Sequence, residues 1–237
     1  MDFNLQRVAR NMTRNMYGTD IVANNLANSS TTGFKRDAAF TDWLMEAKEL
    51  GATQRYTNHS QGEMISTQNP LDVALAGDGF FVVETNSGLG FTRNGHFKID
   101  EDGLLRTAQG HIVRGENGPI PALDTDGLGG NFEVTRNGEI IIDNVVIDRL
   151  AIASIPDLYS LKKLGSNVFQ VDTDALVVQM DPDDIDIRQG MLEGANVQPV
   201  LEMVNLIELQ RNFESSQRVA RAMDHILGRA VQLSDYR

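Results

Sequence analysis

The C-terminal stretch from Asn196 to Arg237 constrains the fold most, because it is predicted to be one long helix whose apolar face needs a partner. Apolar and small residues recur at alternating steps of three and four, at Leu206, Leu209, Phe213, Ser216, Ala220, Met223, Leu227 and Ala230. This spacing keeps one face of a slightly underwound helix turned toward a second helix. Further apolar residues outside that row widen the stripe, namely Val204, Ile207, Val219 and Ile226. A stripe of this width indicates more than one neighbour.

The start of this helix is expected at an Asn196 cap, with Pro199 in the first turn, where the missing N–H of proline is not needed. Residues 3–27 are predicted to form the partner helix. The same spacing of three and four recurs there, at Leu5, Val8, Met12, Thr19, Val22 and Leu26. The row is interrupted at Asn15, where Met16 substitutes one position late. This first helix is expected to end near Asn28, because the run from Ser29 to Gly33 prefers turns to helix interiors.

The middle of the chain changes to the period of two that is typical of strands. Leu71, Val73 and Leu75 alternate with other residues, and Phe80 to Val83 follow a glycine-rich turn. Turn pairs then recur at hairpin spacing, at Asn94-Gly95, Asp102-Gly103, Gln109-Gly110, Asn117-Gly118, Asn137-Gly138 and Asp143-Asn144. Asn-Gly and Asp-Gly pairs supply the positive φ angles that tight hairpins need. Many short strands without intervening helices indicate an antiparallel sandwich or barrel-like domain.

The sequence therefore predicts a mainly β central domain together with an α-helical coiled-coil region formed by the N- and C-terminal helices. Residues 1–34 are assigned to the first helix and its turn, and residues 35–68 to an irregular connector. Residues 69–190 are assigned to the β domain, and residues 191–237 to the C-terminal helix that pairs with the first segment.

The charge distribution argues against a nucleic-acid partner. The chain of 237 residues has a formal net charge of −12, and its middle holds −13, because residues 1–40 sum to +2 and residues 191–237 to −1. An acidic surface repels phosphate backbones. No apolar run approaches the length of a membrane span, and Asp2, Arg7 and Arg10 interrupt any hydrophobic core of a cleavable signal. Another export route is therefore expected if the protein leaves the cytoplasm. Cysteine is absent, which excludes disulfides and cysteine-based zinc sites.

No catalytic, cofactor-binding or metal-ligating residues are predicted, so a non-enzymatic protein without a cofactor is expected. His59, His96, His111 and His225 have no second ligand at a metal-binding spacing, and they are interpreted as surface or structural residues. The segment 124–127 resembles the start of a calcium loop but lacks its later acidic ligand. The cluster at Asp181, Asp183, Asp184 and Asp186 could attract a divalent cation, although Pro182 and the alternating Ile185 and Ile187 favour a solvated strand edge.

Several stretches resemble a known family. ANNLANSSTTGFK at residues 23–35 resembles the N-terminal motif of bacterial flagellar axial proteins, the family of rod, hook and hook-associated subunits. EGANVQPVLEMVNLIELQRNFESSQRVARAMD at residues 193–224 is similar to their C-terminal motif. LAGDGFF at 75–81, FTRNGHFKIDEDGLL at 91–105 and QGHIV at 109–113 resemble the β domain that rod and hook proteins share.

This resemblance implies a structural subunit of the flagellar rod that assembles into a helical tube with other rod subunits and with itself. It also implies export through the flagellar type III apparatus without signal cleavage, and a location in the periplasmic rod of the basal body. The short connection from Phe34 to Gly77, the NPLDVAL run at 69–75 and the ending ILGRAVQLSDYR are most similar to the proximal-rod members. The distal rod protein remains an alternative within the family.

Assembly residues are expected in the two helical rows and in the turn after the first helix. In the rows, they are Leu5, Val8, Met12, Val22 and Leu26, which should meet Leu206, Leu209, Phe213, Met223 and Leu227. In the turn, the residues that match the family motif are Asn24, Asn25, Asn28, Gly33 and Phe34. The alternative is that these rows, Phe213 included, only pack inside the monomer.

Two alternatives from other classes of protein remain open. A surface-binding β domain, such as an adhesin or a carbohydrate-binding module, would present clustered aromatic side chains, but the chain has one Trp and four Tyr. A metal-dependent hydrolase would need carboxylates that converge with a histidine, which the acidic cluster at 181–186 could join only through the fold.

Overall fold

The chain divides into two compact units in a computed structural model. The structure describes residues 2–40, 54–122, 131–165, 167–171 and 176–234, with only the backbone at 2–5, 40, 54 and 227–234. Unit 1 comprises Met1–Ser29, Arg36–Asn58 and Val197–Arg237, and unit 2 comprises Ser30–Lys35 and His59–Asn196. Both units therefore contain segments that are far apart in the sequence.

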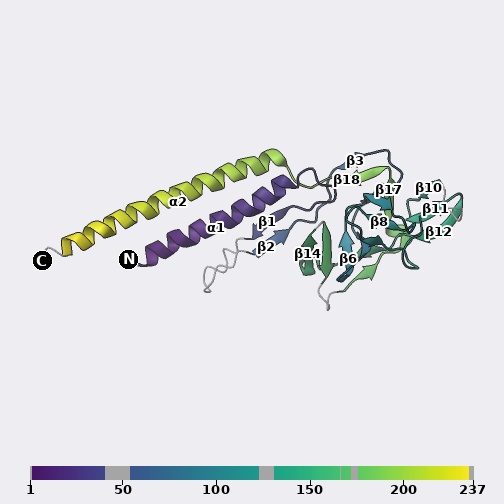
Figure 1. The fold of residues 1–237 in the computed structure, drawn as a ribbon, viewed down its shortest axis with the longest axis horizontal. Coiled ribbons are helices and arrows are strands. Elements are labelled where there is room, and N and C mark those ends of the chain that lie inside the picture. The colour runs from purple at the N-terminus through teal and green to yellow at the C-terminus, as the bar shows by residue number, and fades with distance from the viewer. Residues whose placement is uncertain (1, 41–53, 123–130, 166, 172–175, 235–237) are drawn as a thin grey trace. The chain divides into compact units, whose positions relative to one another are not determined.

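Unit 1 is built around two long helices that pack against each other, α1 (Asp2–Ala27) and α2 (Pro199–Ser234). They run antiparallel, so the N-terminal end of α1 lies beside the C-terminal half of α2 (Figure 1). A two-stranded antiparallel ribbon, β1 (Asp37–Phe40) and β2 (Gln54–Thr57), belongs to the same unit, and β1 contacts α1. The predicted end of the first helix near Asn28 is confirmed.

The row on α1 differs from its prediction at the interruption. Met16 does not substitute for Asn15, because its side chain is 57% exposed, whereas Asn15 is partly buried. Gly18 is buried there, and a Cβ on it would lie 3.2 Å from the Leu209 side chain. Since glycine lacks a side chain, α2 can approach α1 closely at this point, a contact that apolar periodicity does not reveal.

Unit 2 consists of short antiparallel strands, as the sequence predicts, with two 3₁₀ turns. The longest hydrogen-bonded path runs β14-β15-β6-β5-β9-β8-β7, with β13 joined to β5 and to β16, and these nine strands form one sheet among the described residues. Three smaller sheets are β10-β11-β12, β4-β17 and β3-β18. The bounds are β3 (Met64–Ser66), β4 (Val73–Ala76), β5 (Phe80–Thr85), β6 (Gly88–Thr92), β7 (Phe97–Ile99), β8 (Leu105–Thr107), β9 (Ile112–Val113), β10 (Phe132–Val134), β11 (Glu139–Ile142), β12 (Val145–Arg149), β13 (Ile152–Ser154), η2 (Leu158–Ser160), β14 (Leu161–Gly165), β15 (Val168–Val171), β16 (Val178–Gln179), η3 (Pro182–Asp184), β17 (Asp186–Gln189) and β18 (Met191–Glu193).

The central strand β5 separates two hydrophobic clusters. Phe81 and Val83 pack into the larger cluster, whereas Phe80 and Val82 pack into the smaller one, which also contains Phe169. Successive side chains of a strand point to opposite faces, so β5 is covered on both sides and reads as a continuous apolar run. This burial explains why FFVV contains no polar position.

The turn pairs of the hairpins are confirmed with one exception. Positive φ angles occur at Gly103, Gly110 and Gly138, and at both Asp143 and Asn144 in the β11–β12 connection. Gly95 does not have a positive φ. A Cβ on Gly95 would instead overlap the carbonyl oxygen of Val73, so this glycine permits close approach of the backbone to β4.

Two further expectations differ from the structure. Residues 35–68 were expected to be irregular, but they contain β1, β2 and β3, and β3 pairs with β18 from the far end of the chain. Asn196 is not the cap of the C-terminal helix, because Glu202 N donates to Gln198 O and α2 begins at Pro199. The Asn196 amide instead donates to Ser60 O at 2.9 Å.

Candidate functional site

The apolar surface of α2 is divided into a partly covered row and an exposed one. The residues of the row predicted to face α1 are partly buried in unit 1, at Leu206, Leu209, Phe213 and Met223. Outside this row, Val204, Ile207, Val219 and Ile226 are between 47% and 60% exposed. Within unit 1, α1 therefore covers only part of the apolar width of α2.

The first turns of α2 carry several exposed apolar side chains. Val200 is 72% exposed, and Met203, Val204 and Ile207 are about half exposed. Val200, Val204 and Ile207 lie four and three residues apart, so they share one helix face. Contiguous exposed apolar side chains of this kind mark interaction surfaces in soluble proteins.

The turn after α1 is held by asparagine side chains that bond to backbone groups. Asn25 is fully buried, and its amide donates to Asp37 O at 2.7 Å while its carbonyl oxygen accepts from Asp37 N at 2.9 Å. Asn28 Nδ2 donates to Asn24 O at 2.9 Å, at the C-terminal end of the helix. The Asn24 side chain is exposed. Asn25 thus joins α1 to the start of β1, while Asn24 remains available at the surface.

Gly33 and Phe34 lie inside unit 2. Gly33 has φ +68°, its N–H donates to Glu193 O at 2.7 Å, and a Cβ there would crowd the backbone of Asn94. The Phe34 ring is buried, with the Lys163 ammonium 4.5 Å from its centroid. These two motif residues therefore have a structural explanation within the monomer.

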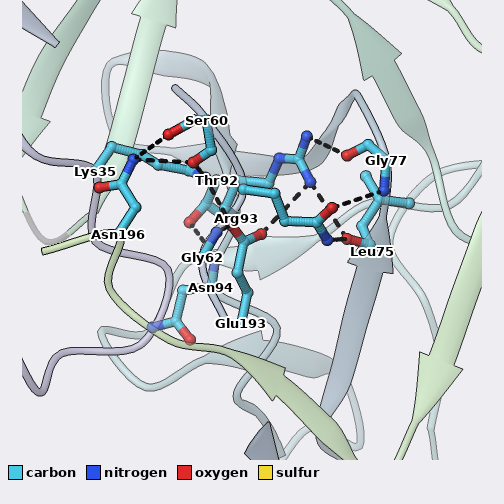
Figure 2. A network of polar contacts seen from close by, with 11 residues as sticks. Lys35, Ser60, Gly62, Leu75, Gly77, Thr92, Arg93, Asn94, Glu193 and Asn196 are labelled. Carbon is cyan, nitrogen blue, oxygen red and sulfur yellow. Dashed lines mark hydrogen bonds and ion pairs between the residues drawn. The ribbon is translucent and has the colours of Figure 1, made fainter. Parts of the chain in front are cut away.

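A buried cluster of charges follows directly after Phe34 (Figure 2). Lys35 Nζ lies 2.6 Å from Glu193 Oε1 and donates to Ser60 O at 2.7 Å. Arg93 Nη1 lies 3.5 Å from Glu193 Oε2, and Nη2 donates to Gly77 O at 2.7 Å. The backbone N–H of Gly62 also donates to Glu193 Oε1. One carboxylate therefore joins four segments of unit 2.

Burial of this cluster disfavours the charged forms of Lys35 and Arg93. Burial lowers the pKa of Lys35, and the attraction and hydrogen bond of Glu193 offset only part of that shift. Burial likewise lowers the pKa of the Arg93 guanidinium, again partly offset by Glu193. Two buried cations share one direct carboxylate partner, so the cluster depends strongly on Glu193.

Unit 1 has a corresponding ion pair on the next residue of the chain. Arg36 Nε lies 2.5 Å from Glu202 Oε1, and the Glu202 side chain is buried. Sequence reasoning selected neither Lys35 nor Arg36, and it also missed Arg93, Glu193 and Glu202. The one sequence hint is that Lys35 ends the N-terminal motif and Glu193 opens the C-terminal one, which does not show that the two charges meet.

The expected row residues lie on the paired helices. Val8, Met12 and Leu26 are partly buried and Val22 is buried on α1. Val8 and Met223 line the same groove, and Gly18 contacts Leu209. The side chains of Leu5 and Leu227 lie outside the described residues.

The candidate chemical residues do not converge. Among the described residues, no group of three or more His, Asp or Glu side chains could hold a metal ion. His59 packs edge-on against Phe80 and Phe169, and His96 Nδ1 lies 2.6 Å from Asp72 Oδ1. In the acidic cluster, η3 spans Pro182–Asp184, while Ile185 and Ile187 are buried beside it.

Comparison with known proteins places these features in one family. Three family models match: Flagella basal body rod protein at residues 13–35, Flagellar hook protein FlgE/F/G D1 domain at 74–153, and Flagellar basal body rod FlgEFG protein C-terminal at 188–233. The flagellar basal-body rod protein FlgF of Caulobacter vibrioides is 35% identical over 217 residues, which cover 87% of this chain and 86% of that protein. The chain belongs to the flagellar basal-body rod protein family.

Within this family, FlgF is the better match. FlgF of Escherichia coli K12 is 34% identical over 90% of both chains, whereas FlgG of Agrobacterium fabrum is 31% identical over 92% of this chain and 94% of that protein. Members of the family are structural components of the flagellar rod, and membership implies a location in the flagellar basal body and assembly with other rod subunits. Neither described helix of this rod protein has an apolar stretch long enough to span a membrane.

Proposed function

We propose that this protein is a subunit of the proximal part of the flagellar rod and that it assembles helically with other rod subunits and with its own copies through α1 and α2. The observation that carries this proposal is the exposed row of α2. Val204 and Ile207 remain about half exposed, although Leu209 and Phe213 in the neighbouring row are partly buried within unit 1. A helical assembly uses heterologous contacts that do not close, and an uncovered helix face can supply one side of such a contact.

The proposed assembly residues fall into two groups. The row residues would hold the paired helices in the geometry that neighbours recognise, and they are Leu5, Val8, Met12, Val22, Leu26, Leu206, Leu209, Phe213, Met223 and Leu227. The turn residues Asn24, Asn25, Asn28, Gly33 and Phe34 would fix the end of α1. Only Asn24 among these five is exposed, so it is the one proposed to contact a neighbour directly.

The two units would have different roles in the rod. Unit 2 holds 22 Asp and Glu against 10 Lys and Arg and so carries the whole formal charge of −12, whereas unit 1 holds 11 of each. We propose that the helices form the axial core and that the acidic β domain faces outward, where its charges stay hydrated. The assigned terminal segments 1–34 and 191–237 would then form the axial core, the β domain 69–190 would form the outer surface, and residues 35–68 would connect them.

The proposed route to the rod is the flagellar type III export apparatus, without signal cleavage. Cleavage within α1 would remove row residues such as Val8, which lines a groove together with Val219 and Met223 of α2. Mass spectrometry of the N-terminal peptide from purified basal bodies tests this. A mature N-terminus inside 2–27 would contradict the proposal.

The Phe213→Asp variant tests the assembly proposal, because it places a charge in the apolar row of α2. A strain that lacks the gene should remain non-motile with this variant and regain motility with the Phe213→Leu control. Electron micrographs of the gene-deleted strain should show a rod that stops in its proximal part. Normal motility and a normal rod with Phe213→Asp would overturn the proposal.

The same variant distinguishes assembly from monomer packing. Circular dichroism of the purified full chain measures whether the helices persist in Phe213→Asp. Retained helices with failed assembly support an intermolecular role. Loss of the helices would show that Phe213 serves the monomer, and the exposed Ile207→Asp variant would then replace it as the test.

A further inference from the structure

An open groove lies on unit 1 between α1 and α2. Val8, Val219 and Met223 provide its apolar lining, and Arg7 and Asn11 provide its polar one. Arg7 is exposed, and Arg14 follows it on the same face of α1 seven residues later. The groove therefore combines an apolar floor with a positively charged rim.

The exposed row at the start of α2 has the complementary character. Val200, Val204 and Ile207 are exposed, and Glu208 follows Val204 at i+4, so the carboxylate borders the apolar row. Glu214 is also exposed further along α2. A helix with apolar side chains and a bordering carboxylate fits an apolar groove rimmed by an arginine and an asparagine amide.

We infer that the start of α2 in one copy of this chain docks into the Arg7–Val219 groove of the next copy. This inference rests on the proposed function and names the partner of the exposed surface: a second copy, with Val204 against Val219 and Glu208 toward Arg7. The two surfaces lie at different places on the protein, so the contact is heterologous. Any linear assembly of copies therefore keeps a free groove at one end and a free row at the other.

The contact predicts the shift between neighbouring copies. Val204 and Val219 are 15 residues apart on α2, which corresponds to about 22 Å along a straight helix. Copies in the same orientation would therefore be displaced by about 22 Å along the helix axis. This separation also exceeds the reach of a disulfide, whose Cα atoms lie at most about 7 Å apart.

The absence of native cysteine allows a direct test with the full chain. The Val204→Cys/Val219→Cys double variant cannot form this disulfide within one molecule. Oxidation should therefore give a ladder of covalent multimers on non-reducing electrophoresis. Each single-cysteine variant can give dimers at most.

The matched control pairs Val204→Cys with Ala9→Cys. Ala9 is exposed on α1 two residues after Arg7, and so points away from the groove. This pair should give at least about tenfold less multimer if the cysteines are apart, because disulfide formation requires close approach. Equal yields from the two pairs, or no multimers from the groove pair, would overturn the inference.

Charge reversal provides an independent test. Arg7→Glu or Glu208→Arg alone should lower the rate of multimer formation by the cysteine pair about two- to fivefold, the range of an exposed ion pair. The two reversals together should restore it. A double reversal no better than either single one would contradict the contact.

Two further measurements separate the possible failures. If the double-cysteine variant restores motility to the gene-deleted strain but oxidised basal bodies contain no crosslink, the rod function stands and this contact is wrong. If no variant of the chain enters basal bodies, the proposed function fails with it. Binding of the chain to phosphatidylglycerol vesicles that Arg7→Glu abolishes, without multimers, would assign the groove to an anionic membrane and overturn the inference.

Discussion

Lys35 Nζ and Glu193 Oε1 lie 2.6 Å apart although 158 positions separate the two residues in the sequence, and each residue is only 1% exposed. Lys35 is the last residue of the N-terminal family motif, and Glu193 is the first residue of the C-terminal one. One end of each motif therefore lies inside unit 2, where the two residues pair.

Glu193→Gln should strongly destabilise the β domain. It leaves the Lys35 ammonium and the Arg93 guanidinium buried without their shared carboxylate, and breaking a buried pair in this way costs about 3–5 kcal/mol. The loss in free energy of unfolding is measured by guanidinium denaturation of the full chain, with the unfolding of the β domain as the monitored transition. Glu101→Gln removes the same charge from an exposed position and should change stability by less than about 0.5 kcal/mol. Similar effects of the two variants would contradict a structural role for the pair.

Lys35 should make a contribution to the stability of unit 2 that increases with pH. Burial lowers its native pKa below its ordinary value of 10.5, so between these two values the unfolded state binds more protons than the native state. The free energy of unfolding therefore increases with pH in that window. Comparison of urea unfolding for the wild type and Lys35→Met from pH 7 to 10.5 isolates this contribution. A wild-type slope no more positive than that of the variant would refute it.

Asn25→Ala should loosen the connection between α1 and β1. The substitution removes two hydrogen bonds to the Asp37 backbone and is expected to cost about 2 kcal/mol, roughly 1 kcal/mol for each bond. Hydrogen exchange of the Asp37 amide should accelerate. Asn24→Ala, at the exposed neighbouring position, is the matched control and should leave this exchange unchanged. Equal exchange rates in both variants would show that the Asn25 side chain does not hold β1.

Gly95 and Gly110 should respond differently to asparagine. Gly110 has φ +91° with open space around its Cα, and asparagine tolerates positive φ, so Gly110→Asn should cost less than about 1 kcal/mol. Gly95→Asn would push a side chain into the Val73 carbonyl and should cost about 1–3 kcal/mol or more. Thermal denaturation of both variants measures the difference. Comparable melting temperatures would mean that β4 can move away from Gly95 without penalty.

The sequence also limited what could be anticipated about the charge cluster. Periodicity reports which face of an element is apolar, but it does not report which lysine and which glutamate meet across 158 positions. Arg93 lies in an Arg-Asn-Gly segment that resembles an ordinary hairpin turn, but its guanidinium donates to the carbonyl groups of Leu75 in β4 and of Gly77 just after it. The strands within 35–68 were missed for the same reason, because β3 is stabilised by pairing with β18 rather than by a local pattern.

The sequence by itself determined the two terminal helices, the mainly antiparallel β domain between them and the family, because helical and strand periods and motif residues are local properties of the chain. The positive-φ hairpin turns were determined in the same way. Only the tertiary structure decided that Met16 is exposed and that the Leu209 side chain packs against Gly18. It also decided that Gly95 lets the backbone of Val73 come close, and that the Lys35 ammonium pairs with the Glu193 carboxylate. These features depend on distances between residues remote in sequence, and such distances are set by packing rather than by local preference.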